Sequence, residues 1–166
     1  FDMKTIFKSI LKENENIHFT LAGTLVEKTI IEKTLDLDSN LFSNIKSFER
    51  SELEKLLIGK KVAIFPSYIE GFGISIIEKL SAGIPVVAYA VSGPEEILKP
   101  LKKLLLVNVG DKLEFSKKVT FILKMSDLDY ERLSIKCLEI ANKYKWQKIA
   151  NNTLSFYKKK LREIRN

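Results

Sequence analysis

The sequence predicts an α/β fold in which a parallel sheet is flanked by helices and followed by further helices at the C-terminus. Two observations support this fold class. Stretches with strand character alternate with stretches of helical periodicity over the first two-thirds of the chain, which is typical of βαβ units. Several expected strands are unbroken apolar runs, among them residues 61–67 and 84–90, as expected where helices cover both faces of a sheet.

The first half of the chain begins with a helix and then alternates strands with helices. Residues 2–12 carry apolar side chains at helical spacing. Ser51 and Glu54 predict a capping box at the start of a helix that Gly59 closes. The expected elements are, in order, a helix over 2–12, a strand over 17–23, a helix over 26–37, a short strand over 44–48 and a helix over 51–59.

The second half follows the same alternation and ends in helices. Pro66 halts a short buried strand, and Gly83 stops the helix that begins after Gly73. The expected elements are a strand over 61–67, a helix between Gly73 and Gly83, a strand over 84–90, a helical stretch over 94–99, a last strand over 103–109, and helices over 112–125, 129–144 and 146–164.

Length and composition predict a single domain over residues 1–166. Hydrophobic residues make up 45% of the chain and charged residues 30%, which suits a buried core and a water-facing surface. No apolar run approaches the ~18 residues that span a bilayer. The start at Phe1 lacks the features of a signal peptide and suggests a piece of a longer protein. With one cysteine and one histidine, a disulfide framework is excluded, a zinc site is not expected, and a reducing, cytoplasmic setting fits.

The net charge of +7 lies entirely at the C-terminus. Residues 136–166 hold nine Lys or Arg and two acids, whereas residues 1–135 hold nineteen of each. The simplest interpretation is a solvated helix face, and a second one is peripheral contact with anionic lipid headgroups of a membrane. Nucleic acid is not an expected partner, because the only interleaved aromatics are Phe156 and Tyr157 and no nucleic-acid-binding motif is present.

The residues that are best suited to bind a ligand follow the strand over 61–67. Ligands of such sheets bind outside the carboxyl ends of the strands. There, Gly71 and Gly73 allow a tight turn, and the next helix offers free amide groups to a phosphate. Glu70 precedes the turn and Glu78 follows it, and carboxylates accept hydrogen bonds from sugar hydroxyls. The arrangement suits a nucleotide-sugar, although the spacing alone fits equally well a Glu78 that only faces solvent.

Residues 65–89, FPSYIEGFGISIIEKLSAGIPVVAY, resemble the donor-binding segment of the group 1 family of retaining glycosyltransferases. That family has the GT-B fold, whose C-terminal half is Rossmann-like, and its signature is Glu-x7-Glu. Other stretches extend the resemblance over nearly the whole chain: SGPEEI (92–97), LLLVNVGD (104–111) and YKW (144–146). The matching positions of the main segment are Pro66, Ser67, Glu70, Gly71, Phe72, Gly73, Glu78, Gly83, Pro85, Val86 and Val87.

The resemblance implies a role for each candidate residue. Glu70 would be the catalytic-site residue that faces the hydroxyls of the donor sugar. Glu78 would hold the ribose, the backbone amides of the glycine turn would meet sugar and diphosphate, and Gly23 would lie near the base. The substrate would be a nucleotide diphosphate-sugar, with no cofactor and no metal. The implied donor-binding residues are Gly23, Gly71, Phe72, Gly73, Ile74 and Glu78.

The sequence departs from the family pattern in two ways. Lys79 stands where the family has Ala, and Ser92 and Leu104 replace glycines. The family's first strand, with an Arg and a Lys that neutralise the diphosphate, would precede Phe1-Asp2, which resembles the end of a Lys-Gly-Phe-Asp-like stretch. We therefore expect that strand and an N-terminal acceptor domain to lie outside this chain, which by itself would bind nucleotide weakly and be inactive.

The full protein is expected to transfer a sugar to a glycan or lipid-linked acceptor, as in polysaccharide biosynthesis. By the same resemblance, the last helix would pack on the N-terminal domain through an apolar face, and its basic face would meet solvent or membrane. Two alternatives remain: a non-catalytic nucleotide-binding subunit of a split transferase, and a nucleotide-sugar epimerase or glycan phosphorylase of the same fold. The apolar face consists of Ile149, Thr153, Phe156 and Tyr157.

Asp36-Leu37-Asp38 matches the Asp-x-Asp pattern of metal-dependent glycosyltransferases with the other main fold. That motif holds a divalent cation beside a diphosphate and has to end a strand. Here it ends a helical stretch, and Asp38-Ser39-Asn40 is typical of a turn. The sequence therefore predicts that these aspartates are structural.

Overall fold

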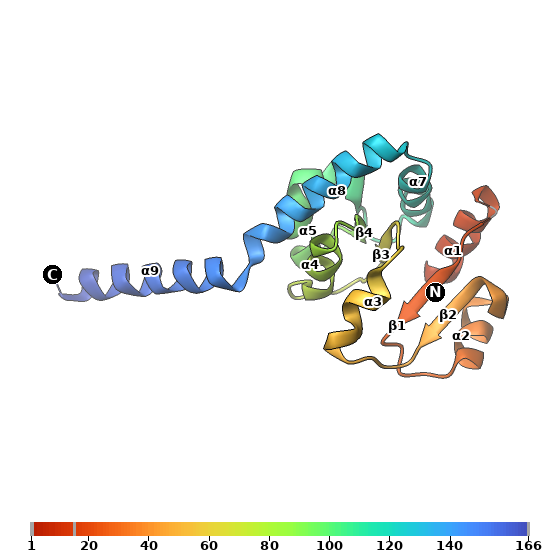
Figure 1. Ribbon diagram of the computed structural model, residues 1–166, viewed down its shortest axis with the longest axis horizontal. Helices are drawn as coiled ribbons and strands as arrows, with labels where there is room; N and C mark the ends of the chain where they lie inside the picture. Colours follow the sequence, from red (N-terminus) through yellow and green to blue (C-terminus); the bar gives the residue numbers. More distant parts are fainter. Residues whose placement is uncertain (1, 15, 166) are drawn as a thin grey trace.

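The computed structural model describes residues 2–14 and 16–165 (Figure 1). Within this part of the chain, strands and helices alternate as the sequence predicts. The likeness of Phe1-Asp2 to a family stretch and the outer limits of the expected 1–166 domain involve Phe1 and Asn166, which lie outside the described residues.

The strands form two parallel sheets rather than one. β1 (Phe19–Ala22) pairs with β2 (Phe42–Ile45), and a second sheet has the order β3 (Ala63–Phe65), β4 (Val86–Tyr89), β5 (Leu106–Val107). All neighbours pair in parallel, which confirms the α/β class, whereas the division into two sheets was not predicted. The registers place Phe19 opposite Phe42, Ala63 opposite Val86, and Ala88 opposite Leu106.

Helices connect the strands and continue after them. Short 3₁₀ turns flank several helices: η1 (Ser39–Leu41), η2 (Arg50–Glu52), η3 (Lys99–Leu101) and η4 (Asn142–Tyr144). The α-helices are α1 (Asp2–Glu13), α2 (Lys28–Leu35), α3 (Leu53–Leu57), α4 (Ile74–Ser81), α5 (Ser92–Leu98), α6 (Lys102–Leu105), α7 (Lys112–Leu123), α8 (Asp127–Ala141) and α9 (Trp146–Arg165).

The core lies around β4, whose four residues are all buried. On one side α4 packs against β4 and α8, and α7 also contacts β4. Helix α1 packs against α7 and buries Ile6, Phe7 and Ile10. The Phe7 ring stacks on Phe19 of β1, with centroids 4.0 Å apart. Because α1 contacts elements of both sheets, it joins their apolar faces into one core.

The predicted last strand over 103–109 is wrong in its first half. Residues 102–105 form helix α6, and only Leu106 and Val107 pair with β4. The Leu106 amide donates to the carbonyl of Lys102, which closes a helical turn and buries Leu105. A short apolar run fits a buried helical turn as well as a buried strand, and here the chain uses both.

Three smaller boundary predictions also need correction. The capping box is formed by Glu49 and Glu52 around η2, not by Ser51 and Glu54, because the chain enters the helix two residues earlier than predicted. The short strand is 42–45 rather than 44–48. Helix α8 begins at Asp127 rather than at 129, since the Ser126 side chain accepts a hydrogen bond from the Asp129 amide and so caps the helix.

Helix α9 confirms the predicted helix over 146–164 and projects away from the rest of the chain (Figure 1, blue). Its side chains from 146 to 164 are exposed apart from a half-buried Ile149. The packing of its apolar face on a further domain stays a prediction. In the described part of the chain, no helix is both long and apolar enough to cross a bilayer.

Candidate functional site

The segment between β3 and α4 forms a turn that depends on Gly73. This residue is the N-cap of α4 and adopts φ 99° and ψ 44°, in the left-handed region that glycine adopts without strain. A Cβ at this position would lie 3.2 Å from Ile97 Cδ1 and 3.3 Å from Ile76 Cδ1. The backbone angle therefore favours glycine, as the sequence predicts for a tight turn before a helix, and a Cβ here would also crowd two isoleucine side chains.

The first turn of α4 faces this glycine turn with free backbone donors. The amides of Ile76 and Ile77 both donate to the Gly73 carbonyl, at 3.0 and 3.2 Å. The amides of Ile74 and Ser75 are those that a helix start leaves without an intrahelical acceptor. Together with the positive end of the helix dipole, they make this point suited to an anionic group.

Glu70 lies beside the turn and is half-buried. The Phe72 amide donates to Glu70 Oε1 over 3.4 Å, a long and therefore weak hydrogen bond. Both groups were expected to contact the donor. In this structure they contact each other, so a ligand that displaced this bond would gain an amide donor and a carboxylate acceptor at the same point.

Glu78 is the fifth residue of α4, and its side chain is only 26% exposed. Its carboxylate lies 3.7 Å from the Lys79 ammonium group, which is similarly shielded. Lys79 is the residue that replaces the family's Ala. Glu78 is therefore not a freely solvated side chain, and the adjacent Lys79 adds a positive charge next to the proposed ribose contact.

Gly93 supports the glycine turn from behind. A Cβ on Gly93 would lie 2.4 Å from the Phe72 carbonyl oxygen and 2.7 Å from its carbon, distances that real side chains do not reach. The start of α5 and the turn thus touch backbone to backbone. The sequence places Gly93 in a family-like motif but does not predict its contact with Phe72, since nothing local indicates which backbone approaches it.

Phe72 also contacts the segment that leads into α9. Its ring meets the Tyr144 ring edge to face, with centroids 5.8 Å apart. Tyr144 belongs to η4 and immediately precedes Lys145. Burial, together with the nearby charge of Glu96, raises the pKa of Tyr144, so its hydroxyl stays neutral. Phe72 is thus held by Gly93 on its backbone side and by Tyr144 on its ring side.

Gly23 was predicted in the same site but belongs to the other sheet. It follows β1 with φ 73°, and its amide donates to the Ile45 carbonyl at 2.8 Å. The side chain nearest to a Cβ built there is Phe48. The structure places the other candidates at the β3–α4 turn and Gly23 at the end of β1. The candidates at the β3–α4 turn are Glu70, Gly71, Phe72, Gly73, Ile74 and Glu78.

The aspartates of the Asp-x-Asp pattern have structural partners, as predicted. Asp36 ends α2 in the left-handed region, with φ 51°, and its carboxylate pairs with Lys4 and Lys8 of α1. These lysines hold the pKa of Asp36 below its ordinary value. The Asp38 side chain accepts the Asn40 amide at 2.8 Å and caps η1. Both carboxylates therefore stabilise the connection between α2 and β2.

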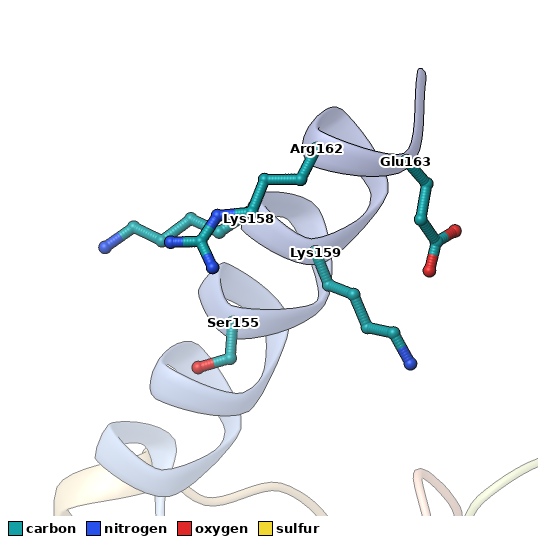
Figure 2. A pocket seen from close by; sticks show the side chains of 5 residues that line it. All are labelled: Ser155, Lys158, Lys159, Arg162 and Glu163. Carbon is teal, nitrogen blue, oxygen red and sulfur yellow. The ribbon is translucent and has the colours of Figure 1, made fainter. Parts of the chain in front are cut away.

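One surface hollow lies on α9, away from the β3–α4 turn. Figure 2 shows that Lys158 and Arg162 extend to one side of the helix and Lys159 and Glu163 to the other. All five lining residues, these four and Ser155, come from one helix. A hollow with no second wall does not enclose a ligand, so we place the candidate site at the β3–α4 turn.

Comparisons with known proteins identify the family of the chain. Residues 2–137 match the model of the family described as glycosyl transferases group 1. A D-inositol 3-phosphate glycosyltransferase from Nocardioides sp. is 30% identical over 116 residues, which are 70% of this chain and 25% of that protein. An uncharacterised glycosyltransferase from Methanocaldococcus jannaschii is 32% identical over 108 residues, 64% of this chain and 27% of that protein. The chain thus spans about a quarter of these relatives.

Solved structures show the same fold. TarM of S. aureus, a mutant in complex with UDP and other ligands, superposes with a TM-score of 0.78 at 20% identity over 93% of this chain and 31% of that one. Sucrose-phosphate synthase from Thermosynechococcus elongatus gives 0.74 at 19% identity over 97% and 42%. These relatives do not favour the epimerase or the non-catalytic subunit. With the family match over most of its length, the chain belongs to the group 1 glycosyltransferases, and its fold is that of a GT-B domain.

Proposed function

We propose that this chain is the donor-binding part of a retaining glycosyltransferase that uses a nucleotide diphosphate-sugar. The observation that carries the proposal is the arrangement at the β3–α4 turn. Along the chain, Glu70 precedes Gly73 and Glu78 follows it, and the free amides of the first turn of α4 come between the two acids. The two carboxylates can accept hydrogen bonds from the hydroxyls of a sugar and of a ribose, and the amides between them can bind the diphosphate that joins the two.

Each residue has a defined role in this proposal. Glu78 accepts hydrogen bonds from the ribose hydroxyls, and the backbone amides of Phe72, Gly73 and Ile74 meet the sugar and the diphosphate. Glu70 exchanges its weak bond to the Phe72 amide for the hydroxyls of the sugar, and so orients the sugar. Gly23 lies near the base. The UDP in the TarM complex supports a nucleotide diphosphate as the common ligand of this fold.

The proposed reaction retains the configuration at the anomeric carbon. The bond from that carbon to the diphosphate oxygen breaks, and the acceptor oxygen forms its bond on the same face. The acceptor proton passes to the leaving diphosphate. The helix N-terminus stabilises the developing negative charge, and the proposal includes no metal ion. A glycan or a lipid-linked acceptor is the second substrate, held by the part of the longer protein that this chain does not cover.

Ligand-observed NMR with a panel of UDP-, GDP- and ADP-sugars tests the proposal. We expect the chain to bind at least one of them. Glu78→Gln keeps the shape of the side chain but removes its charge, and should weaken binding roughly tenfold or more, because a hydrogen bond to a charged group contributes about 1.5–3 kcal/mol. Glu131→Gln on the exposed face of α8 is the matched control and should bind as the unchanged chain does.

Two results would contradict the proposal. If no nucleotide-sugar gives a signal at millimolar concentration, the turn is not a donor site. If Glu78→Gln binds as tightly as the control, the ribose contact is assigned to the wrong residue. Binding that appears only with a divalent cation would overturn the metal-free mechanism and return attention to Asp36 and Asp38.

A further inference from the structure

Four segments that are distant in the sequence meet at the carboxylate of Asp2. The hydroxyls of Tyr68 and Tyr89 both donate to Asp2 Oδ2, at 2.6 and 2.7 Å. The Lys112 ammonium group lies 3.4 Å from Oδ1. Asp2 begins α1, Tyr68 follows β3, Tyr89 ends β4 and Lys112 begins α7. The Asp2 side chain is only 14% exposed, so its carboxylate is largely shielded from water.

The two tyrosines differ in how firmly the fold holds them. Tyr89 is fully buried, and its ring packs edge to face on Phe115, with centroids 5.3 Å apart. Tyr68 is 55% exposed, yet its ring packs on Tyr89 at 5.5 Å. Because Asp2 accepts both hydroxyls, the buried Tyr89 and α1 together fix the orientation of the exposed Tyr68.

The position of Tyr68 constrains the path of residues 66–73, which we call the donor segment. Residues 66–73 contain no helix or strand, so their path is set by a few tertiary contacts. Tyr68 lies two residues before Glu70. Downstream, Gly93 and Ile97 constrain Phe72 and Gly73. The hydrogen bond from Tyr68 to Asp2 supplies the corresponding constraint upstream of Glu70.

An acid in the first turn of a helix often acts only through the helix dipole. Asp2 does more than that, because a single oxygen accepts two phenolic hydroxyls from other segments. These bonds favour the ionised carboxylate, and the bond from Tyr68, followed by that from Tyr89, lowers the pKa of Asp2 below its ordinary value. Desolvation and the same carboxylate raise the pKa of Tyr89, so both tyrosines remain donors.

We infer that Asp2 is a positioning residue for the donor site, acting through the hydroxyl of Tyr68 to hold the segment that carries Glu70 and the glycine turn. Its effect on ligand affinity rests on the proposed function. Its effect on the geometry of the segment does not.

Backbone amide NMR tests the geometric part without any ligand. Asp2→Asn weakens both acceptor bonds, and Tyr68→Phe removes only the hydroxyl that reaches the donor segment. We expect both variants to shift or broaden the amide signals of Gly71 and Gly73. Asp36→Asn is the matched control, because Asp36 also binds α1, through Lys4 and Lys8, but lies outside the donor segment. It should leave these signals unchanged.

Titration with the nucleotide-sugar that binds the unchanged chain tests the functional part. Affinity should fall roughly tenfold in Asp2→Asn, the equivalent of a lost hydrogen bond to a charged group, and should stay constant in Asp36→Asn. If no nucleotide-sugar binds the unchanged chain, the proposed function fails while the amide measurement still decides the inference.

Unchanged Gly71 and Gly73 signals in both variants would overturn the inference. A change in Asp2→Asn with none in Tyr68→Phe would overturn it as well, because Asp2 would then act through the core and not through the donor segment. Tyr68→Phe removes only one hydroxyl from a residue that is 55% exposed, so it provides a folded variant should Asp2→Asn unfold.

Discussion

Helices α4 and α9 are both amphipathic, but among the described residues only α4 buries its apolar face against other elements. Helix α4 buries Ile76 and Leu80 completely and packs against α8 and β4. Helix α9 exposes its apolar residues, including Phe156 and Leu161, each 56% exposed. Of the described elements, it shares its main contacts with η4.

In both helices the sequence pattern predicts an apolar face, but the surrounding structure determines whether that face is buried. Helical periodicity indicates which face of a helix is apolar, and it did so for both helices. It does not indicate whether that face is covered. Most helical stability in proteins comes from packing of the apolar face, so equal patterns in α4 and α9 have unequal energetic consequences.

The largest expected effect compares the same substitution in the two helices. Leu80→Ala removes a fully buried side chain and should lower the free energy of unfolding by about 2–5 kcal/mol. Leu161→Ala removes a side chain from the exposed face of α9 and should change it by no more than about 0.5 kcal/mol. Urea unfolding followed by circular dichroism measures both values. Equal losses in the two variants would show that α9 is packed.

A second comparison concerns two glycines, Gly71 in the β3–α4 turn and Gly93, which packs against that turn. Gly93→Ala would place a Cβ against the Phe72 backbone and should lower the free energy of unfolding by about 1–3 kcal/mol, as overpacking does. A Cβ at Gly71 would meet no atom within 4 Å, so Gly71→Ala should stay within about 0.5 kcal/mol. Thermal unfolding distinguishes them, and a neutral Gly93→Ala would contradict the close contact with the turn.

The smallest expected effect depends on pH. The folded-state pKa of Asp2 lies below its ordinary value of 3.8, so its contribution to stability is complete above that value. It is lost as the pH falls through the lowered pKa. Asp2→Asn should therefore cost about 1–2 kcal/mol near pH 7, and the difference from the unchanged chain should shrink below about pH 4.

Glu163→Gln on α9 provides the control for the pH series. Glu163 pairs with Lys160 at 2.7 Å, but both side chains are about half exposed, and such pairs contribute little. This variant should unfold like the unchanged chain at every pH. A pH-independent cost of Asp2→Asn would mean that the ionised carboxylate is not what stabilises the cluster.

The sequence was sufficient for local features and for the family. Gly73 was correctly placed at the start of α4, because a glycine turn before a helix is a local signal. The parallel strands and the buried β4 followed from alternation and apolar runs. The strand predicted over residues 103–105 is wrong because a run of so few apolar residues does not distinguish helical from strand periodicity. Gly93, Asp2 and Tyr68 were not given their roles, since each depends on a contact that only the folded chain creates: Asp2 and Tyr89 are 87 positions apart.

The contact between Phe72 and Tyr144 connects the β3–α4 turn to the start of α9. Tyr144 leans on the ring of the donor turn, and the backbone passes through one extended residue, Lys145, before the helix axis changes direction. Helix α9 is 20 residues long, and the Tyr144 ring that precedes it packs against Phe72. A change in the direction of α9 would therefore reach the Phe72 ring through Lys145 and Tyr144.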